Sequence, residues 1–381
     1  MTHEPALAGL RVLDFSRVLA GPYASMHLAD LGADVLKVEH PARGDDTRTY
    51  GPPFVDGVST YFLSVNRGKR SVALDLKRPE DRDRALALAD RADVVLENFR
   101  PGVMDRLGLG AYALRARNPG LVYCTIRAFI DPDDPRPGYD LMMQALSGVP
   151  SVTGPEGTPP AKCGASIADL ASGMNAVQGI LAALLRRGRT GRGAHVVVSI
   201  MEAQRSLLTY HAGAWLNAGV AAPRLGNGHR SIHPFCVYPA SEGHLALCIG
   251  NDALWACFCA ALGEPGWAAD PRFVRNIDRV HHRDAVDALL APRFAQDTAR
   301  AWADRLLDAG VPAAPMLTVP EALNGVETVT HPHPTTGAPV HSLPIPMRLD
   351  GVRPVAARPP AALGADTAEA LADWLDDPPA R

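Results

Sequence analysis

An aspartate begins the most apolar stretch of this 381-residue chain. Asp169 lies three residues after Ser166, and the stretch from Leu170 to Leu185 carries no charged residue. That pattern predicts a long buried helix from about Ile167 to Arg187, with Asp169 in its first turn. The free N–H groups and the dipole of a helix start favour an ionised carboxylate. Because such a carboxylate can attack a thioester carbonyl, Asp169 is a candidate nucleophile.

The same position has a simpler interpretation. Ser166 and Asp169 together resemble a capping pattern, in which the serine is the N-cap and the acid lies near the unpaired N–H groups. The neighbours of Asp169 are small, which leaves room for a substrate; they are Ala165, Ala168, Ala171 and Gly173. The two interpretations do not exclude each other.

A second acid, Asp140, follows the turn-forming residues Arg136-Pro137-Gly138-Tyr139 and by position alone is most simply a turn cap. Several basic residues stand at strand ends or just beyond helices, where ligands of parallel sheets bind. They could face phosphates, although each one alone is most simply a solvated surface charge. These residues are Lys37, His40, Arg43, Lys69, Arg70, Lys77 and Arg106.

Motifs for other chemistries fail on their context. Gly108-Leu109-Gly110 follows a helical run rather than a strand, so it predicts a turn and not a dinucleotide fingerprint. The six cysteines contain no C-x-x-C, and only Cys257 and Cys259 lie close together. We therefore expect reduced thiols and no metal site.

The elements that must position these residues change character along the chain. Short β-rich runs alternate with helical patterns over the first half, which predicts an α/β domain with a parallel sheet covered on both faces. A hairpin pattern from Phe235 to Ile249 then opens a smaller domain, and eight prolines between His331 and Pro360 predict an extended return. The expected parts are a large domain over 1–200, a linker over 201–225 with one helix from Met201 to Asn217, a small α+β domain over 226–330, and a return over 331–381 whose last helix, Thr367 to Leu375, docks on the large domain.

Composition excludes several classes of partner. A formal net charge of -3 and 21% charged residues give no basic surface for nucleic acid or an anionic membrane. The N-terminus lacks the basic and apolar regions of a signal peptide, and we expect no membrane span. A cytoplasmic enzyme is the expectation.

Several separate motifs resemble the class III CoA-transferases, the CaiB/BaiF family. The resemblance runs from about residue 7 to Leu375, in the family's order. The motifs are Val12-Leu13-Asp14-Phe15-Ser16-Arg17-Val18-Leu19-Ala20-Gly21-Pro22, Leu31-Gly32-Ala33-Asp34-Val35-Leu36-Lys37-Val38-Glu39, Asn66-Arg67-Gly68-Lys69-Arg70-Ser71, Glu97-Asn98-Phe99-Arg100-Pro101-Gly102, Gly138-Tyr139-Asp140 with Gln144-Ala145-Leu146-Ser147-Gly148, and the nucleophile segment Ile167-Ala168-Asp169-Leu170-Ala171-Ser172-Gly173.

The resemblance implies a Rossmann-like large domain without a nicotinamide and a ring-shaped subunit in an interlocked homodimer. It also implies that coenzyme A (CoA) and its acyl thioesters are substrates, with no tightly bound cofactor. Asp140 and Gln144 are candidates for the substrate pocket. The residues that the family match assigns to the CoA site are Val18, Leu19, Ala20, His40, Leu74, Lys77, Asn98, Phe99, Arg106 and Tyr139.

The activity implied is transfer of CoA to a free carboxylic acid through aspartyl anhydride and thioester intermediates on Asp169. Formyl-CoA transferases of the family carry Gln where this chain has Leu19, and a glycine-rich loop that residues 243–260 lack. A bulkier or more apolar acid than oxalate is therefore favoured. The alternative enzyme is an α-methylacyl-CoA racemase, which needs a His where this chain has Tyr139. A CoA-binding regulatory protein is a third alternative, disfavoured by the intact nucleophile position.

Overall fold

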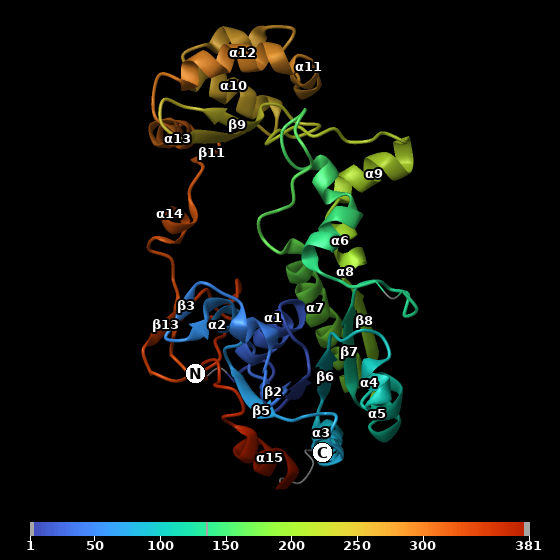
Figure 1. Cartoon of the computed structure of the whole chain (residues 1–381). Coiled ribbons are helices and arrows are strands. Elements are labelled where there is room, and N and C mark those ends of the chain that lie inside the picture. The colour runs from blue at the N-terminus through green and yellow to red at the C-terminus, as the bar shows by residue number, and fades with distance from the viewer. Residues whose placement is uncertain (1–3, 135, 377–381) are drawn as a thin grey trace. The chain divides into compact units, whose positions relative to one another are not determined.

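The protein is described from a computed structural model that covers residues 4–134 and 136–376 (Figure 1). The chain divides into two compact units. Unit 1 contains Met1–Val149, Cys163–Leu208 and Glu327–Arg381, and unit 2 contains Pro150–Lys162 and Thr209–Val326. The chain therefore enters unit 2 twice, and its first visit falls inside the range that sequence analysis assigned to the large domain.

Six parallel strands form the central sheet of unit 1, as the alternating pattern predicted (Figure 1). The spatial order β5-β2-β1-β6-β7-β8 is the strand order of Rossmann folds, and it reverses between β1 and β6. The strands are β1 (Arg11–Asp14), β2 (Asp34–Glu39), β5 (Lys69–Ala73), β6 (Val94–Glu97), β7 (Val122–Arg127) and β8 (His195–Ser199).

Alternate residues of these strands pack into two different cores, one on each face of the sheet. Val12 packs with helices α1 (Ala20–Asp30) and α7 (Ile167–Thr190), whereas Leu13 packs with α3 (Pro79–Arg91), α5 (Ala111–Arg117) and α15 (Thr367–Asp376). In α15, Trp374 is fully buried and donates its indole N–H to Asp34 at 2.7 Å.

Helix α7 is long and apolar enough to cross a membrane, with 24 residues and a mean hydropathy of 1.3, and it alone passes that test among the described residues. Sequence analysis did not anticipate this. The helix packs against α1, β7 and β8 in unit 1, and 44% of its apolar window is buried. Core helices of globular domains have the same composition.

Shorter elements complete unit 1. The proline-rich return is extended where β12 and β13 pair as an antiparallel ribbon, and His331 within it is buried against the Ala356 carbonyl at 2.8 Å. These elements are η1 (Asp46–Thr49), β3 (Phe54–Val55), β4 (Val58–Ser59), α2 (Thr60–Val65), α4 (Val103–Arg106), α6 (Asp140–Ser147), α8 (Ile200–Ser206), β12 (Val329–Pro332) and β13 (Pro339–Ser342).

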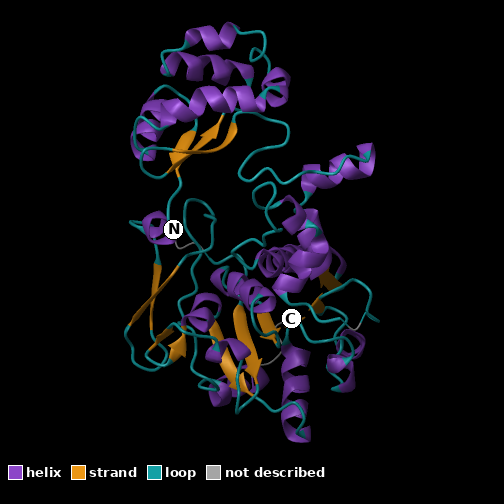
Figure 2. Cartoon of the chain, turned by 45° about the horizontal axis from the view of Figure 1, so that its top comes forward, coloured by secondary structure: helices purple, strands orange, loops and turns teal. Residues whose placement is uncertain are grey.

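Unit 2 has its own core between a small antiparallel sheet and several helices (Figure 2). The predicted hairpin is β9 (Phe235–Pro239) and β10 (His244–Cys248), and β11 (Ala313–Pro315) pairs with its other edge. The remaining elements of unit 2 are α9 (Thr209–Ala218), α10 (Asp252–Ala261), η3 (Pro265–Ala269), α11 (Asn276–His281), α12 (Arg283–Phe294), α13 (Ala299–Asp308) and α14 (Val319–Leu323), while η2 (Val149–Val152) lies at the junction with unit 1.

The single helix expected from Met201 to Asn217 is wrong. The chain forms α8 and α9 instead, and Thr209 between them has a positive φ of 37°. No glycine or proline marks the break, so local propensity predicted one helix. Packing produces the interruption, because α8 buries residues such as Met201 in unit 1 and α9 buries none.

Candidate active site

The site lies where the strand order of the sheet reverses. In open parallel sheets ligands bind beyond the carboxyl ends of the two strands at that point, which here are β1 and β6. The segment after β1 leads through Val18 into α1, and the segment after β6 contains Asn98 and Phe99. Asn98 joins the two segments, because its side chain accepts from the Arg17 N–H at 2.8 Å and donates to the Arg17 carbonyl at 2.7 Å.

Two neighbouring cavities open at this point within unit 1. The first, called here the Asp169 cavity, has a volume of about 180 Å³. Its wall contains Asp169 together with six of the residues assigned to the CoA site. Those six are Val18, Leu19, Ala20, Asn98, Phe99 and Tyr139.

The second, called here the basic cavity, has a volume of about 340 Å³. Phe99 lines both cavities, so they adjoin at this residue. Four further residues of the expected CoA site lie here: His40, Leu74, Lys77 and Arg106. All ten expected residues therefore border one of two adjoining cavities, with cations at one end and Asp169 at the other.

The first turn of α7 carries Asp169 as predicted, but its capping differs from the expectation. Ser166 makes no side-chain capping bond. The carboxylate of Asp140 caps the helix instead, since the Ala168 N–H donates to Asp140 Oδ1 at 3.0 Å. Ser166 is the N-cap residue and Asp169 is in the first turn, as the capping interpretation had it, but the side-chain acceptor comes from Asp140 and not from Ser166.

The environment of Asp169 opposes its ionisation. Desolvation by burial, followed by the nearby negative charge of Asp140, raises the pKa of Asp169 from 3.8 to about 7. Sequence analysis expected the helix start to hold the carboxylate ionised, but burial outweighs that effect here. An acid with a pKa near 7 is a stronger nucleophile when ionised than an ordinary aspartate, and it is half ionised at neutral pH.

Asp140 and Gln144 were expected to line the substrate pocket, yet both side chains are occupied with the segment that leads into α7. Gln144 is fully buried and donates to Asp140 Oδ2 at 2.8 Å. Its amide oxygen accepts the N–H of Cys163 at 2.8 Å. The pair therefore positions the start of α7, and with it Asp169.

Close packing of α7 on α1 brings Asp169 beside α1. Gly173 stands one turn after Asp169, and a Cβ at Gly173 would lie 2.7 Å from the Ala20 carbonyl oxygen and 3.0 Å from Cδ1 of Tyr23. Only glycine permits that approach. Because α1 has no side-chain cap, its start presents backbone N–H groups near the residues that line the Asp169 cavity.

Sequence analysis missed several residues near the reacting carboxylate. Tyr61 on α2 is one, because burial and the charge of Asp169 raise the pKa of its phenol. Arg100, Arg127 and Arg136 also line the Asp169 cavity. Tyr61 and Arg127 lie outside every quoted motif. Arg100 stands in a quoted motif and Arg136 in the turn before Asp140, so their cationic character was the available signal.

The seven basic residues noted in the sequence divide into two groups. His40, Arg43, Lys77 and Arg106 line the basic cavity. Lys37 and Lys69 are 2% exposed and belong to buried polar contacts, while Arg70 pairs with Asp34 at 2.5 Å and with Asp373 at 2.6 Å. Only the first group is available to a ligand.

One cluster of metal-type donors occurs among the described residues, in unit 2. His233, Cys236 and Asp287 have donor atoms within 4.8 Å of one another. However, Arg283 approaches His233 Nδ1 at 3.1 Å, which leaves the imidazole proton on Nε2, 3.2 Å from Asp287. The Tyr238 hydroxyl also donates to Asp287, at 2.6 Å. A metal-bound histidine donates its second N–H to an acceptor, but here the second nitrogen, Nδ1, faces the donor Arg283. This donor set therefore fits a hydrogen-bonded network better than a cation site.

Comparison with known proteins decides the family. The profile described as CoA-transferase family III matches residues 7–367. The chain belongs to CoA-transferase family III. It is 43% identical over 323 residues to acetyl-CoA:oxalate CoA-transferase of Acetobacter aceti, which covers 84% of this chain and 83% of that protein. It is 37% identical over 378 residues to succinyl-CoA:glutarate CoA-transferase of Mus musculus, with 97% and 86% covered.

A solved structure supports the same assignment. A CaiB/BaiF family protein from Brucella suis superposes with a TM-score of 0.85 at 36% identity, covering 98% of this chain and 100% of that one. The resemblance seen in the sequence is therefore confirmed, and the protein is an enzyme of this class.

Proposed function

We propose that this family III CoA-transferase moves CoA from an acyl-CoA thioester to a free carboxylic acid, with Asp169 as the nucleophile. The observation that carries the proposal is the alignment of two adjoining cavities. Cations suited to the nucleotide phosphates line one, and a desolvated carboxylate faces the other. A CoA thioester extended past Phe99 would bring its carbonyl carbon to Asp169.

The first half of the reaction releases the donor acid. A carboxylate oxygen of Asp169 attacks the thioester carbonyl, the C–S bond breaks, and CoA leaves as a thiolate. The thiolate then attacks the aspartyl carbonyl of the mixed anhydride, which expels the donor acid as a carboxylate and leaves an aspartyl-CoA thioester. The acyl activation is retained at each step, so the chemistry needs no nucleotide hydrolysis.

The second half repeats the steps with the acceptor. The acceptor carboxylate attacks the aspartyl carbonyl and expels the thiolate, which forms a second anhydride. The thiolate attacks the acceptor's acyl carbon, and Asp169 leaves as a carboxylate with the new thioester complete. Backbone N–H groups at the start of α1 are the proposed donors to the oxyanions of these steps. The anhydrides require a site that excludes water.

We propose a dicarboxylic acid as the acceptor. Arg100 and Arg127 line the cavity that contains Asp169, and an arginine fork binds a carboxylate in two hydrogen bonds. Arg136 also lines the cavity, but it is already paired with Asp134 at 2.6 Å. The relatives named above act on oxalate and glutarate, a short and a longer dicarboxylate. Chain length separates the two, and the sequence argument from Leu19 and residues 243–260 favours the longer acid.

We also propose a cytoplasmic homodimer, as the family resemblance implies. The apolar side chains on α9 support an assembly, because Trp215 is 59% exposed and Leu216 is 78% exposed. Apolar surface of that kind is normally covered by a partner. An active monomer in light scattering at micromolar concentration would contradict the dimer.

The experiment on the function itself uses Asp169→Ala. We expect transfer from succinyl-CoA to glutarate to be abolished while CoA still binds, and hydroxylamine added during turnover to label Asp169 in the unmodified enzyme. Asp304→Asn, at an exposed position of α13 in unit 2, is the matched control and should keep full activity. Turnover by Asp169→Ala would refute the nucleophile.

The racemase alternative predicts deuterium uptake by a 2-methylacyl-CoA, whereas the transferase predicts none. Tyr139 stands where a racemase needs its histidine, so (R)-2-methylacyl-CoA in D₂O should take up no deuterium over hours. Rapid uptake with inversion, and no transfer to any acid, would make Asp169 a base. The next candidates to mutate as its partner would then be Asp140 and His229.

A further inference from the structure

The segment between β1 and α1 contains a strained residue at the wall of the Asp169 cavity. Val18 has a positive φ of 69°, in the left-handed region that β-branched residues avoid. Such a conformation costs free energy and persists only when surrounding contacts impose it. The strained residue lies in the wall of the cavity itself, which contains Val18, Leu19 and Ala20.

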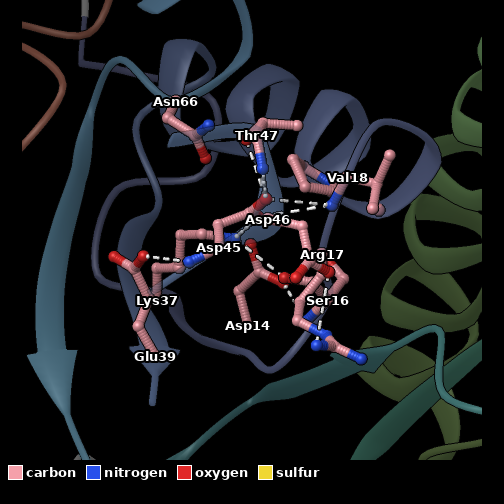
Figure 3. A network of polar contacts seen from close by, with 12 residues as sticks. Asp14, Ser16, Arg17, Val18, Lys37, Glu39, Asp45, Asp46, Thr47 and Asn66 are labelled. Atoms are coloured by element: carbon pink, nitrogen blue, oxygen red, sulfur yellow. Dashed lines mark hydrogen bonds and ion pairs between the residues drawn. The ribbon is translucent and has the colours of Figure 1, made fainter. Parts of the chain in front are cut away.

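A buried ion pair supplies the imposing contacts (Figure 3). The side chain of Asp45 accepts the Val18 N–H at 3.2 and 3.3 Å. Lys37 Nζ pairs with Asp45 Oδ2 at 2.8 Å and donates to the Ser16 carbonyl at 2.8 Å. One cation–anion pair therefore holds two backbone groups of the segment, on either side of Arg17.

Both charges are buried and are held in place from several sides. The Lys37 and Asp45 side chains are 2% and 0% exposed. Burial by itself would raise the pKa of Asp45, but Lys37 and the N–H and hydroxyl of Thr47 outweigh it and hold that pKa at about 2. Despite burial, the nearby carboxylates also raise the pKa of Lys37, so the pair is ionised at every working pH.

Lys37 lies too deep to touch a ligand, and Asp45 only borders the basic cavity with its side chain directed to Val18 and Lys37. We propose that Lys37 and Asp45 are positioning residues, which hold Val18 in its left-handed conformation and thereby place the Val18–Ala20 wall against Asp169. The inference rests on the proposed function for its effect on turnover. The predicted effect on CoA binding is independent of the proposed function.

A double-mutant cycle between Asp45 and Val18 tests the proposal, because glycine adopts a positive φ without strain. In the native background Asp45→Asn should lower kcat/KM by about 10- to 100-fold, as expected for a displaced reacting group. In a Val18→Gly background the same change should cost less than about 3-fold, because the segment no longer needs to be held. The affinity for free CoA, measured by calorimetry, should show the same coupling.

The matched control is another buried ion pair of unit 1. Asp30 and Arg67 pair at 2.6 Å with side chains 0% and 1% exposed, and Asp30 also accepts the Ala356 N–H at 3.0 Å. Asp30→Asn should lower thermal stability by an amount that does not depend on Val18→Gly, and its effect on CoA affinity should be identical in both backgrounds.

Additive effects of Asp45→Asn and Val18→Gly on CoA affinity would overturn the proposal. So would a folded Asp45→Asn with native affinity and turnover. If Asp45→Asn does not fold, Thr47→Val replaces it in the cycle, since it removes the hydroxyl that orients Asp45 Oδ1, the oxygen that accepts the Val18 N–H. A protein without transferase activity would refute the proposed function, while the coupling in CoA affinity would still decide the role of the ion pair.

Discussion

Replacing the proposed nucleophile should make the protein more stable, by an amount that grows as the pH rises from about 4 to 7. The pKa of Asp169 is about 7 in the folded protein and 3.8 when unperturbed, because burial and the charge of Asp140 disfavour its ionised form. That difference corresponds to about 4 kcal/mol. The folded state carries this cost whenever Asp169 ionises on unfolding.

The sign follows from the direction of the shift. Below pH 3.8 the carboxyl is protonated in both states and costs nothing. As pH rises towards 7 the unfolded chain ionises first, so the cost grows, and above 7 it is constant. Asp169→Asn carries no charge and avoids the cost. It should stabilise the fold by up to about 4 kcal/mol at pH 8, by about 2 kcal/mol at pH 5.5 and by well under 1 kcal/mol at pH 4.

Thermal unfolding of the two proteins across this pH range measures the difference. A chain of 381 residues should melt about 5 °C higher at pH 8 when Asp169 is asparagine. The exposed Asp304→Asn variant should show a difference that does not vary with pH. An Asp169→Asn variant whose advantage is equal at pH 5 and pH 8, or absent at both, would show that Asp169 is not desolvated and would remove the electrostatic basis of its assignment.

Three further predictions concern the same unit. The acidic limb of the pH profile of kcat/KM should lie near pH 7 and move to lower pH in Asp140→Asn, because removing the neighbouring negative charge lowers the pKa of Asp169; an unmoved limb would contradict the coupling. Gly173→Ala should destabilise the fold by about 1–3 kcal/mol and reduce kcat, since its Cβ would lie 2.7 Å from the Ala20 carbonyl oxygen, whereas Gly188→Ala on the same helix meets nothing within 4 Å and should stabilise slightly. Arg106→Ala should raise KM for acyl-CoA about 10-fold or more while kcat changes little, with the exposed Arg78→Ala as control; equal effects of the two variants would argue against phosphate binding in the basic cavity.

The sequence predicted most of the fold, because its signals are local. Alternating β-rich and helical runs gave the parallel sheet, and the uncharged run after Leu170 gave α7 with Asp169 in its first turn. Motif order gave the family and the residues expected around CoA. Each of these depends on neighbours along the chain, and so they can be recognised before any tertiary contact is known.

Tertiary structure decided which residues of one type share a role. Lys37 and Lys77 look alike in the sequence as basic residues near strand ends, yet one is buried in an ion pair with Asp45 and the other lines the basic cavity. The same holds for Asp140, which caps α7, and Asp169, whose pKa burial raises to about 7. Charge and spacing identify such groups, but desolvation and partner distance determine their chemistry, and both depend on segments far away in the chain.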